Sequence, residues 1–182
     1  NYCLIGEAEH TTVINAAKEW GLGSKVAFDG TPLQGKDSYS VTFEADSYSW
    51  VYPVFQQHVP KGTAQLYVWN LKLVKTGEDR NLLANLKVED FKSVMADEGL
   101  VSIVDIDPDD LQPTQDNSKT PIGGDSVWLL DFSGYTGESE NPNLYFNVEV
   151  EKEKTYTFSF QYCVIGETTS TRVINAAKDW GM

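Results

Sequence analysis

The sequence predicts an all-β protein, a jelly-roll β-sandwich of two antiparallel sheets with little helix. About ten short segments have strand-like patterns, and turn signals separate them at regular spacing. Almost no segment repeats its apolar residues with the period of a helix. Several strands are apolar on both faces, which is typical of a jelly roll in which one face packs the core and the other lines a cleft or lies under loops.

The first part of the chain predicts a hairpin, a short strand and one clear amphipathic strand. Residues 2–14 contain an extended run, a turn and a β-branched run, so they predict a hairpin. A short strand is expected over 25–28 within a glycine-rich loop. Residues 39–45 alternate between apolar and polar side chains. The face expected to point inward carries Tyr39, Val41, Phe43 and Ala45.

The middle of the chain predicts three further strands. Residues 50–55 are apolar on both faces, and Pro53 within them indicates an edge strand or a bulge. A long strand is expected over 63–74, and another over 100–106 because it is rich in β-branched residues. Between these two, residues 89–98 could form a single helical turn.

The last part predicts a long polar loop over 107–125, followed by strands over 126–132, 144–150 and 155–165. A charged turn at 151–154 joins the last two strands, and both of them alternate well. The residues expected to face inward are Leu144, Phe146, Val148, Val150, Tyr156, Phe158, Phe160, Tyr162 and Val164.

One stretch of the sequence occurs twice. Residues 2–21 recur as 162–181 without a gap, and 14 of the 20 pairs are identical. The offset between the copies is 160 residues, which is the size of one globular domain. The chain is therefore interpreted as one period of a tandem array plus an overlap. Local duplication of a short motif is the alternative. The two cysteines, Cys3 and Cys163, are equivalent positions, so each is expected to be a small buried apolar residue rather than half of a disulfide.

The net charge of −13 limits the partners. Phosphate binding needs a basic face, so neither nucleic acid nor an anionic membrane surface is expected as a partner. No apolar run is long enough to cross a bilayer, so membrane insertion is not expected either. A neutral ligand, a cation or another protein is the better fit to this charge.

Three stretches resemble the β-sandwich carbohydrate-binding modules of the family 4, 9 and 22 type. Asn81-Leu82-Leu83-Ala84-Asn85 followed by Glu89 resembles their opening motif, and 154–160 (KTYTFSF) resembles their central strand. Residues 63–74 resemble the closing strand, although Trp69-Asn70-Leu71 stands where aspartates are usual. The resemblance implies a non-catalytic module of a secreted or cell-surface multimodular protein that binds a polysaccharide or another glycan. It also implies a structural calcium ion.

The resemblance also implies an order of modules. Residues 1–77 would be the C-terminal half of one module, and residues 78–182 the N-terminal half of the next. The two halves could close into one permuted sandwich, because the termini of compact domains often lie close together. The second copy of the repeat could instead join neighbouring modules or copies of the chain by strand donation. The alternative function is therefore a structural or adhesive surface repeat without a sugar site.

Candidate sugar-binding residues are aromatic, because sugar rings stack their apolar C–H faces on aromatic rings and form hydrogen bonds at their edges. The candidate platform residues are Trp50, Tyr52, Trp69 and Trp128. Polar edge partners could be Gln56, Gln57 and Asn147. Alternatively these aromatics fill the core. Trp50 and Tyr52 are the best candidates for exposure, because Val51 and Phe55 can fill the core from the opposite face.

The acidic stretch that begins the long loop is a candidate calcium site, because Ca²⁺ prefers several oxygen ligands. Its carboxylates are Asp105, Asp107, Asp109 and Asp110. The spacing is not that of an EF-hand, and a solvated acidic loop is the alternative.

Catalysis is not expected. The chain has only two histidines, His10 and His58, and the repeat carries serine in place of the first. No nucleophile motif and no glycine-rich phosphate loop occurs. Acidic chains always contain paired carboxylates, so their presence does not indicate a glycosidase.

Overall fold

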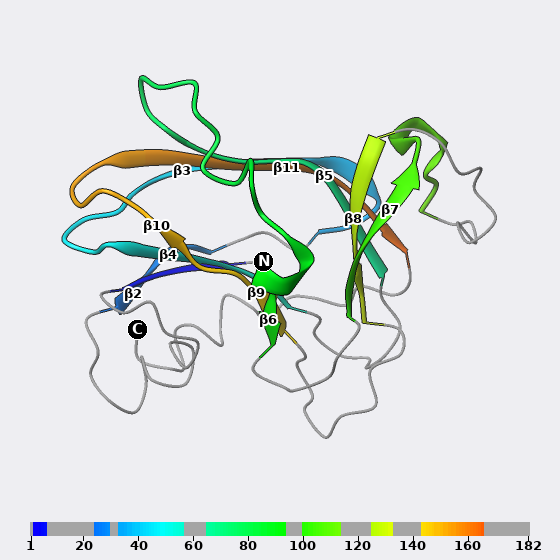
Figure 1. Ribbon diagram of the computed structural model, residues 1–182, viewed down its shortest axis with the longest axis horizontal. Coiled ribbons are helices and arrows are strands. Elements are labelled where there is room, and N and C mark those ends of the chain that lie inside the picture. The colour runs from blue at the N-terminus through cyan, green and yellow to red at the C-terminus, as the bar shows by residue number, and fades with distance from the viewer. Residues whose placement is uncertain are drawn as a thin grey trace.

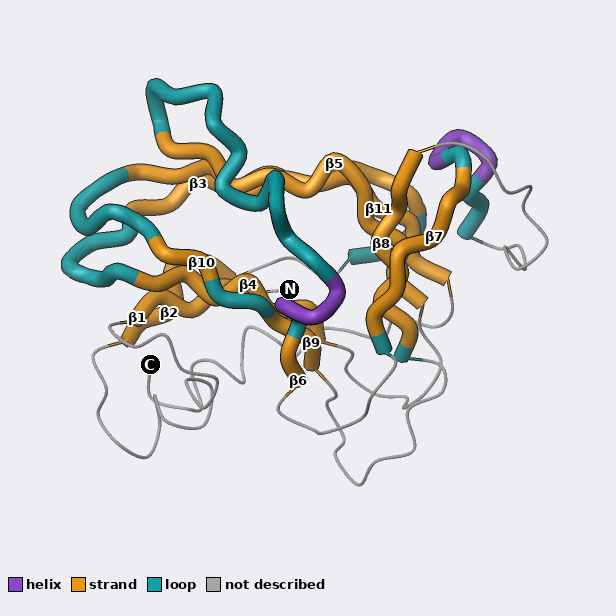
Figure 2. Tube along the Cα trace, viewed as in Figure 1, coloured by secondary structure: helices purple, strands orange, loops and turns teal. Residues whose placement is uncertain are grey.

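The computed structural model describes residues 2–6, 24–29, 33–56, 65–93, 100–113, 125–132 and 143–165. These residues form two antiparallel sheets that face each other as two layers (Figure 1). Helix in the described ranges is limited to two short 3₁₀ turns, η1 (Val88–Asp90) and η2 (Pro108–Asp110) (Figure 2). The predicted all-β sandwich with two antiparallel sheets is therefore confirmed.

The six-stranded sheet has the order β2-β1-β4-β9-β6, and β10 also pairs with β4. Its strands are β1 (Tyr2–Gly6), β2 (Ser24–Asp29), β4 (Trp50–Gln56), β6 (Lys92–Ser93), β9 (Asn143–Tyr145) and β10 (Val148–Glu149). β1 pairs with β2 on one side and with β4 on the other. The first arm of the predicted 2–14 hairpin thus has different partners from those expected, and its second arm lies outside the described residues.

The five-stranded sheet has the order β3-β11-β5-β8-β7. Its strands are β3 (Lys36–Glu44), β5 (Gln65–Lys75), β7 (Val101–Ile106), β8 (Asp125–Asp131) and β11 (Thr155–Ile165). β11 pairs with β3 and with β5 on its two sides, so a strand from after residue 77 lies between two strands from before it. The division into halves of successive modules at this residue remains a prediction.

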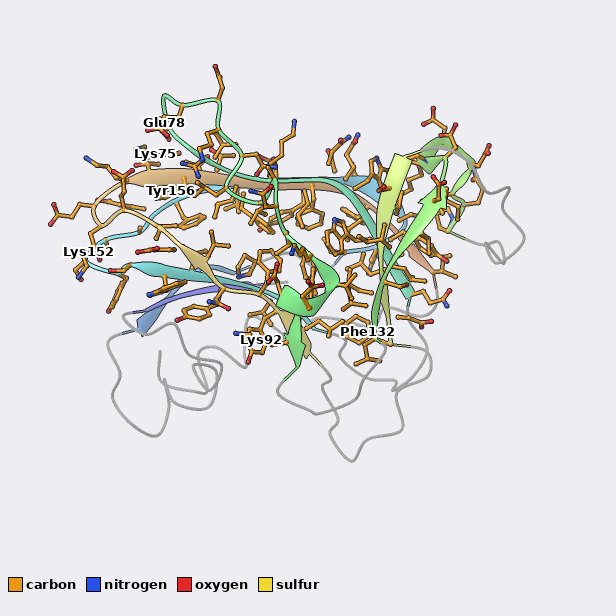
Figure 3. All side chains as sticks on the ribbon, viewed as in Figure 1. Lys75, Glu78, Lys92, Phe132, Lys152 and Tyr156 are labelled. Atoms are coloured by element: carbon orange, nitrogen blue, oxygen red, sulfur yellow. The ribbon has the colours of Figure 1, made fainter. Side chains whose placement is uncertain are left out.

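The predicted inward faces of three segments, 39–45, 144–150 and 155–165, contribute to the main core between the sheets (Figure 3). All thirteen predicted side chains belong to this core or pack against it: Tyr39, Val41, Phe43, Ala45, Leu144, Phe146, Val148, Val150, Tyr156, Phe158, Phe160, Tyr162 and Val164. Each large apolar side chain buried there contributes about 1.5–3 kcal/mol. The single strand expected over 144–150 is in fact two short strands, β9 and β10.

The turn that follows β5 is tied to that strand by Asn81. The Asn81 side-chain oxygen accepts hydrogen bonds from the backbone N–H groups of Leu73 and Leu83, both at 3.0 Å. Its amide nitrogen donates to the carbonyl oxygen of Leu71 at 3.1 Å. One polar side chain thereby fixes the segment that crosses from the five-stranded sheet toward η1.

A β-bulge at Asn70 divides β5 into two halves. Even-numbered residues face the main core before the bulge, and odd-numbered residues face it afterwards. Trp69 pairs with Gln161 and Lys72 pairs with Ser159, so β5 has one residue more than β11 between these pairs. Asn70 adopts a positive φ of 52°, the left-handed conformation that asparagine tolerates better than most residues. Leu66 and Val68 face the core before the bulge, and Leu71 and Leu73 face it afterwards.

The bulge predicts a difference between two substitutions at the same position. Both Asn70→Gly and Asn70→Ala remove the side-chain amide, but only alanine keeps a Cβ that opposes the left-handed backbone. We expect Asn70→Ala to be less stable than Asn70→Gly by about 1 kcal/mol in urea unfolding. An alanine variant as stable as the glycine variant would contradict this account of the bulge.

Candidate functional site

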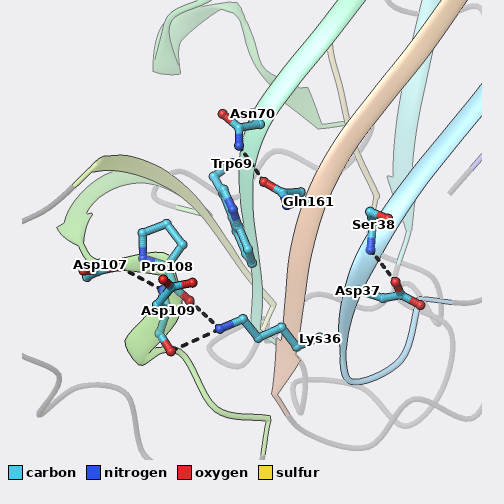
Figure 4. Close-up of a pocket in the computed structure, with 9 residues that line it drawn as sticks. All are labelled: Lys36, Asp37, Ser38, Trp69, Asn70, Asp107, Pro108, Asp109 and Gln161. Carbon is cyan, nitrogen blue, oxygen red and sulfur yellow. Dashed lines mark hydrogen bonds between the residues drawn. The ribbon is translucent and has the colours of Figure 1, made fainter.

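A candidate site within the described residues is a cavity of about 390 Å³ on the outer face of the five-stranded sheet, called the Trp69 pocket here (Figure 4). β3, β5 and β11 provide one wall, and η2 with the residue before it provides the other. The lining residues are Lys36, Asp37, Ser38, Trp69, Asn70, Asp107, Pro108, Asp109 and Gln161. A cavity of this size is within the usual range of small-ligand sites, roughly 300–1,000 Å³.

Trp69 points away from the main core because it lies before the bulge. It belongs to a second, smaller apolar cluster on the outer face, with members Tyr67, Trp69, Ile106, Leu111, Val127 and Cys163. Only 8% of its surface is exposed, and this part lines the pocket. The tryptophan is therefore held rigidly by its neighbours.

Cys163 lies in the same small cluster and is fully buried as a free thiol. Burial raises the pKa of this thiol, which keeps it protonated and unreactive. The prediction of a small buried apolar residue is confirmed for Cys163. The side chain of Cys3 lies outside the described part of the structure.

Lys36 holds η2 in place above the sheet. Its ammonium donates hydrogen bonds to the carbonyl oxygens of Pro108 at 2.6 Å and of Asp109 at 3.2 Å (Figure 4). A third bond goes to the carbonyl oxygen of Leu111 at 3.2 Å. A lysine ammonium has three donors, so all of them are used by η2 and the residue after it. At the other end of η2, the Asp107 carboxylate accepts from the backbone N–H of Asp109 at 2.9 Å as a helix N-cap.

Two amides stand side by side at the rim of the Trp69 pocket. The Asn70 side-chain nitrogen donates to the side-chain oxygen of Gln161 at 2.5 Å. This leaves the Asn70 oxygen as an acceptor and the Gln161 nitrogen as a donor, both on exposed side chains. Exposed carboxylates of Asp37, Asp107 and Asp109 complete the polar lining.

The structure distributes the predicted sugar-binding residues over different environments. Trp69 lines the pocket just described, whereas Trp50 and Asn147 line a separate cavity. Trp128 packs against the main core, with its ring 5.2 Å from that of Phe91, so the core alternative holds for this residue.

Tyr52 is only 1% exposed, so the expectation that it would be an exposed platform residue is wrong. Its strand, β4, is buried on both faces, because Val51 and Phe55 in the main core alternate with it and are buried as well. The side chain of Gln56 and all of Gln57 lie outside the described residues.

The predicted calcium ligands do not converge. Asp107 and Asp109 line the Trp69 pocket, but Asp105 and Asp110 are exposed and do not. No group of three or more potential ligands occurs within the described ranges. A structural calcium ion in this loop stays a prediction.

Another cavity, of about 270 Å³, is occupied by its own charged side chains. Lys75 forms ion pairs with Glu78 and with Glu151, the latter at 2.5 Å, and Tyr156 lies beside them (Figure 3). The hydrogen bond to Glu151 is the main cause that raises the pKa of Lys75, and it lowers the pKa of Glu151 in return. Arg80 and Glu149 also line this cavity. Because Lys75, Glu78 and Glu151 already satisfy one another, we do not take it as a candidate site.

Six residues of the Trp69 pocket were not expected from the sequence: Lys36, Asp37, Ser38, Asn70, Pro108 and Gln161. Asn70 carried a usable signal, because it is the first polar residue after the apolar run of 66–69. Lys36 and Asp37 carried none, since their role depends on where η2 lies.

No family model, curated protein or solved structure matches the chain. No helix in the described part is long and apolar enough to cross a membrane.

The role of Lys36 can be tested with Lys36→Met, which keeps the apolar stem and removes the ammonium. Three carbonyl oxygens would lose their charged donor, so we expect a loss of about 1–2 kcal/mol in unfolding free energy. Hydrogen exchange at the backbone N–H groups of Asp110 and Leu111 should become faster. The matched control is Lys72→Met, an exposed lysine of β5 outside the pocket. Equal effects in both variants would contradict the assignment.

Proposed function

We propose that the protein is a non-catalytic carbohydrate-binding module of a secreted or cell-surface protein, with the Trp69 pocket as its sugar site. The observation that carries the proposal is the combination of one rigid indole with an oriented amide pair in a single cavity. A sugar ring needs an apolar surface for its C–H face and polar groups at its edge. The pocket supplies both.

The amide pair suits two neighbouring hydroxyl groups of a sugar. Each hydroxyl can donate one hydrogen bond and accept others. The free oxygen of Asn70 can accept from one hydroxyl, while the free N–H of Gln161 donates to the next. The hydrogen bond between the two amides keeps this spacing fixed, which lowers the entropy cost of binding.

The charges in the pocket favour a neutral glycan over an acidic one. Three carboxylates line the cavity, and the only lysine among its lining residues has its donors engaged by backbone carbonyls. A uronic acid or a sulfated sugar would meet like charges without a compensating cation. Neutral polysaccharides are therefore the proposed ligand class.

Binding without cleavage is the proposed activity. Asp37, Asp107 and Asp109 are all exposed, whereas the general acid of a glycosidase is typically shielded in an apolar environment. Asp107 is also engaged as the N-cap of η2. The sequence contains no nucleophile motif either.

Gln161→Ala provides the test, because this side chain is exposed and its loss leaves the core intact. We expect the variant to bind a soluble neutral polysaccharide about tenfold more weakly, the loss of roughly one hydrogen bond and its preorganised partner. Affinity electrophoresis against glucan, xylan, mannan and galactan would measure this, with polygalacturonate as the acidic comparison. Lys72→Ala is the control outside the pocket. The proposal fails if no neutral glycan retards the protein, or if Gln161→Ala binds as the unmodified protein does.

A structural or adhesive role by strand donation is the second candidate. The observation that favours it is that one sequence occupies two different strand positions. Tyr2–Gly6 forms β1 between β2 and β4, whereas its repeat at 162–165 ends β11 between β3 and β5. Exchange of strands between copies requires a segment that fits more than one position.

Light scattering across a dilution series, with and without Ca²⁺, tests this second role. Strand donation predicts a molar mass that rises with protein concentration, and a calcium-dependent rise would add support for the proposed ion. A constant monomer mass in both buffers would contradict strand donation and leave the glycan proposal in place.

A further inference from the structure

A second cavity, of about 370 Å³, lies where the segment 82–90 passes the edge of the six-stranded sheet at β10. It shares no lining residue with the Trp69 pocket. Its walls are Trp50, Leu82, Leu83, Asn85, Leu86, Glu89, Asp90, Lys92, Asn147, Val148 and Glu149. We propose that this cavity, the Trp50 pocket, is a separate binding site for an amino sugar with a free ammonium group.

The floor of the Trp50 pocket is apolar. Leu83 and Val148, which are 6% and 9% exposed, belong to the main core and form part of the lining. Trp50 is half-buried and belongs to neither of the two apolar clusters formed by the described residues. No ring contact joins it to another aromatic in the described ranges. An indole of this kind, placed at a cavity rather than in the core, is a suitable surface for the C–H face of a sugar.

Glu149 lies directly beside this indole. Trp50 and Glu149 are opposite each other across the β4–β10 pair, which places their side chains on the same face of the sheet. Glu149 is exposed, and its carboxylate has no hydrogen bond or ion pair to any described residue. A cation placed here would meet a carboxylate and the face of an indole at once, and both attract it.

The other polar groups of the pocket are arranged around this pair. Lys92 donates to the side-chain oxygen of Asn147 at 3.2 Å, which leaves the Asn147 amide N–H groups available for a hydroxyl. Asp90 accepts from the backbone N–H of Lys87, and Glu89 lies 3.6 Å from the Lys87 ammonium. Glu149 is thus the carboxylate that remains for a ligand. An ammonium group together with hydroxyls on an apolar ring is the chemistry of a hexosamine.

The site can be tested by titrating ¹⁵N-labelled protein with sugars and following the NMR signal of the Trp50 indole N–H. A salt concentration of about 150 mM screens the general attraction of cations to the acidic surface. Trp50→Phe identifies the Trp50 indole N–H signal. The probes are glucosamine and N-acetylglucosamine, which differ in the charge on nitrogen. We expect glucosamine to shift the Trp50 signal in a saturable way and N-acetylglucosamine to bind about tenfold more weakly.

Glu149→Gln should weaken glucosamine binding by about tenfold, while Glu44→Gln, the same change at an exposed position outside both pockets, should have no effect. Equal binding of the two sugars, or unchanged binding by Glu149→Gln, would overturn the proposal. So would an absence of any saturable shift. A further arm uses Nα-acetyl-lysine methylamide. Tighter binding of this compound than of glucosamine would replace the amino sugar with a lysine side chain of a protein partner.

Discussion

The bulge at Asn70 is the constraint on which the five-stranded sheet depends. Side chains of a strand alternate between its two faces, so one extra residue moves every following side chain to the opposite face of the sheet. Without the bulge, either Leu66 and Val68 or Leu71 and Leu73 would face away from the core. With it, both pairs are buried and Trp69 faces outward beside Asn70. The same backbone irregularity completes the core and creates the candidate sugar site.

Three lysines that line cavities interact with groups of the protein itself. Lys36 donates to three backbone carbonyls, Lys75 pairs with two glutamates, and Lys92 donates to an asparagine. Each of them lines a different cavity, and each is engaged by the protein itself. In the Trp69 pocket the charges left facing a ligand are therefore carboxylates, which agrees with the net charge of −13 and favours neutral or cationic ligands there.

The predicted order of strands and their inward faces could be obtained from the sequence because they depend on local alternation. Residues 39–45 and 155–165 alternate without interruption, and the structure places the expected side chains in the core. The run 66–69 is apolar at every position, so periodicity could not say which face Trp69 would take. Tyr52 was misjudged for the same reason: β4 is buried on both faces, and no pattern within one strand reports what covers it.

The sequence by itself determined the fold class, the acidic charge and the repeat, since each follows from composition or from neighbouring residues. Only the tertiary structure brought Lys36 and Gln161 to the Trp69 pocket, because these residues are separated by more than a hundred positions and meet through the β3–β11 pairing. It also placed Glu149 opposite Trp50. Strand register determines which residues lie side by side, and register depends on the whole sheet rather than on any one segment.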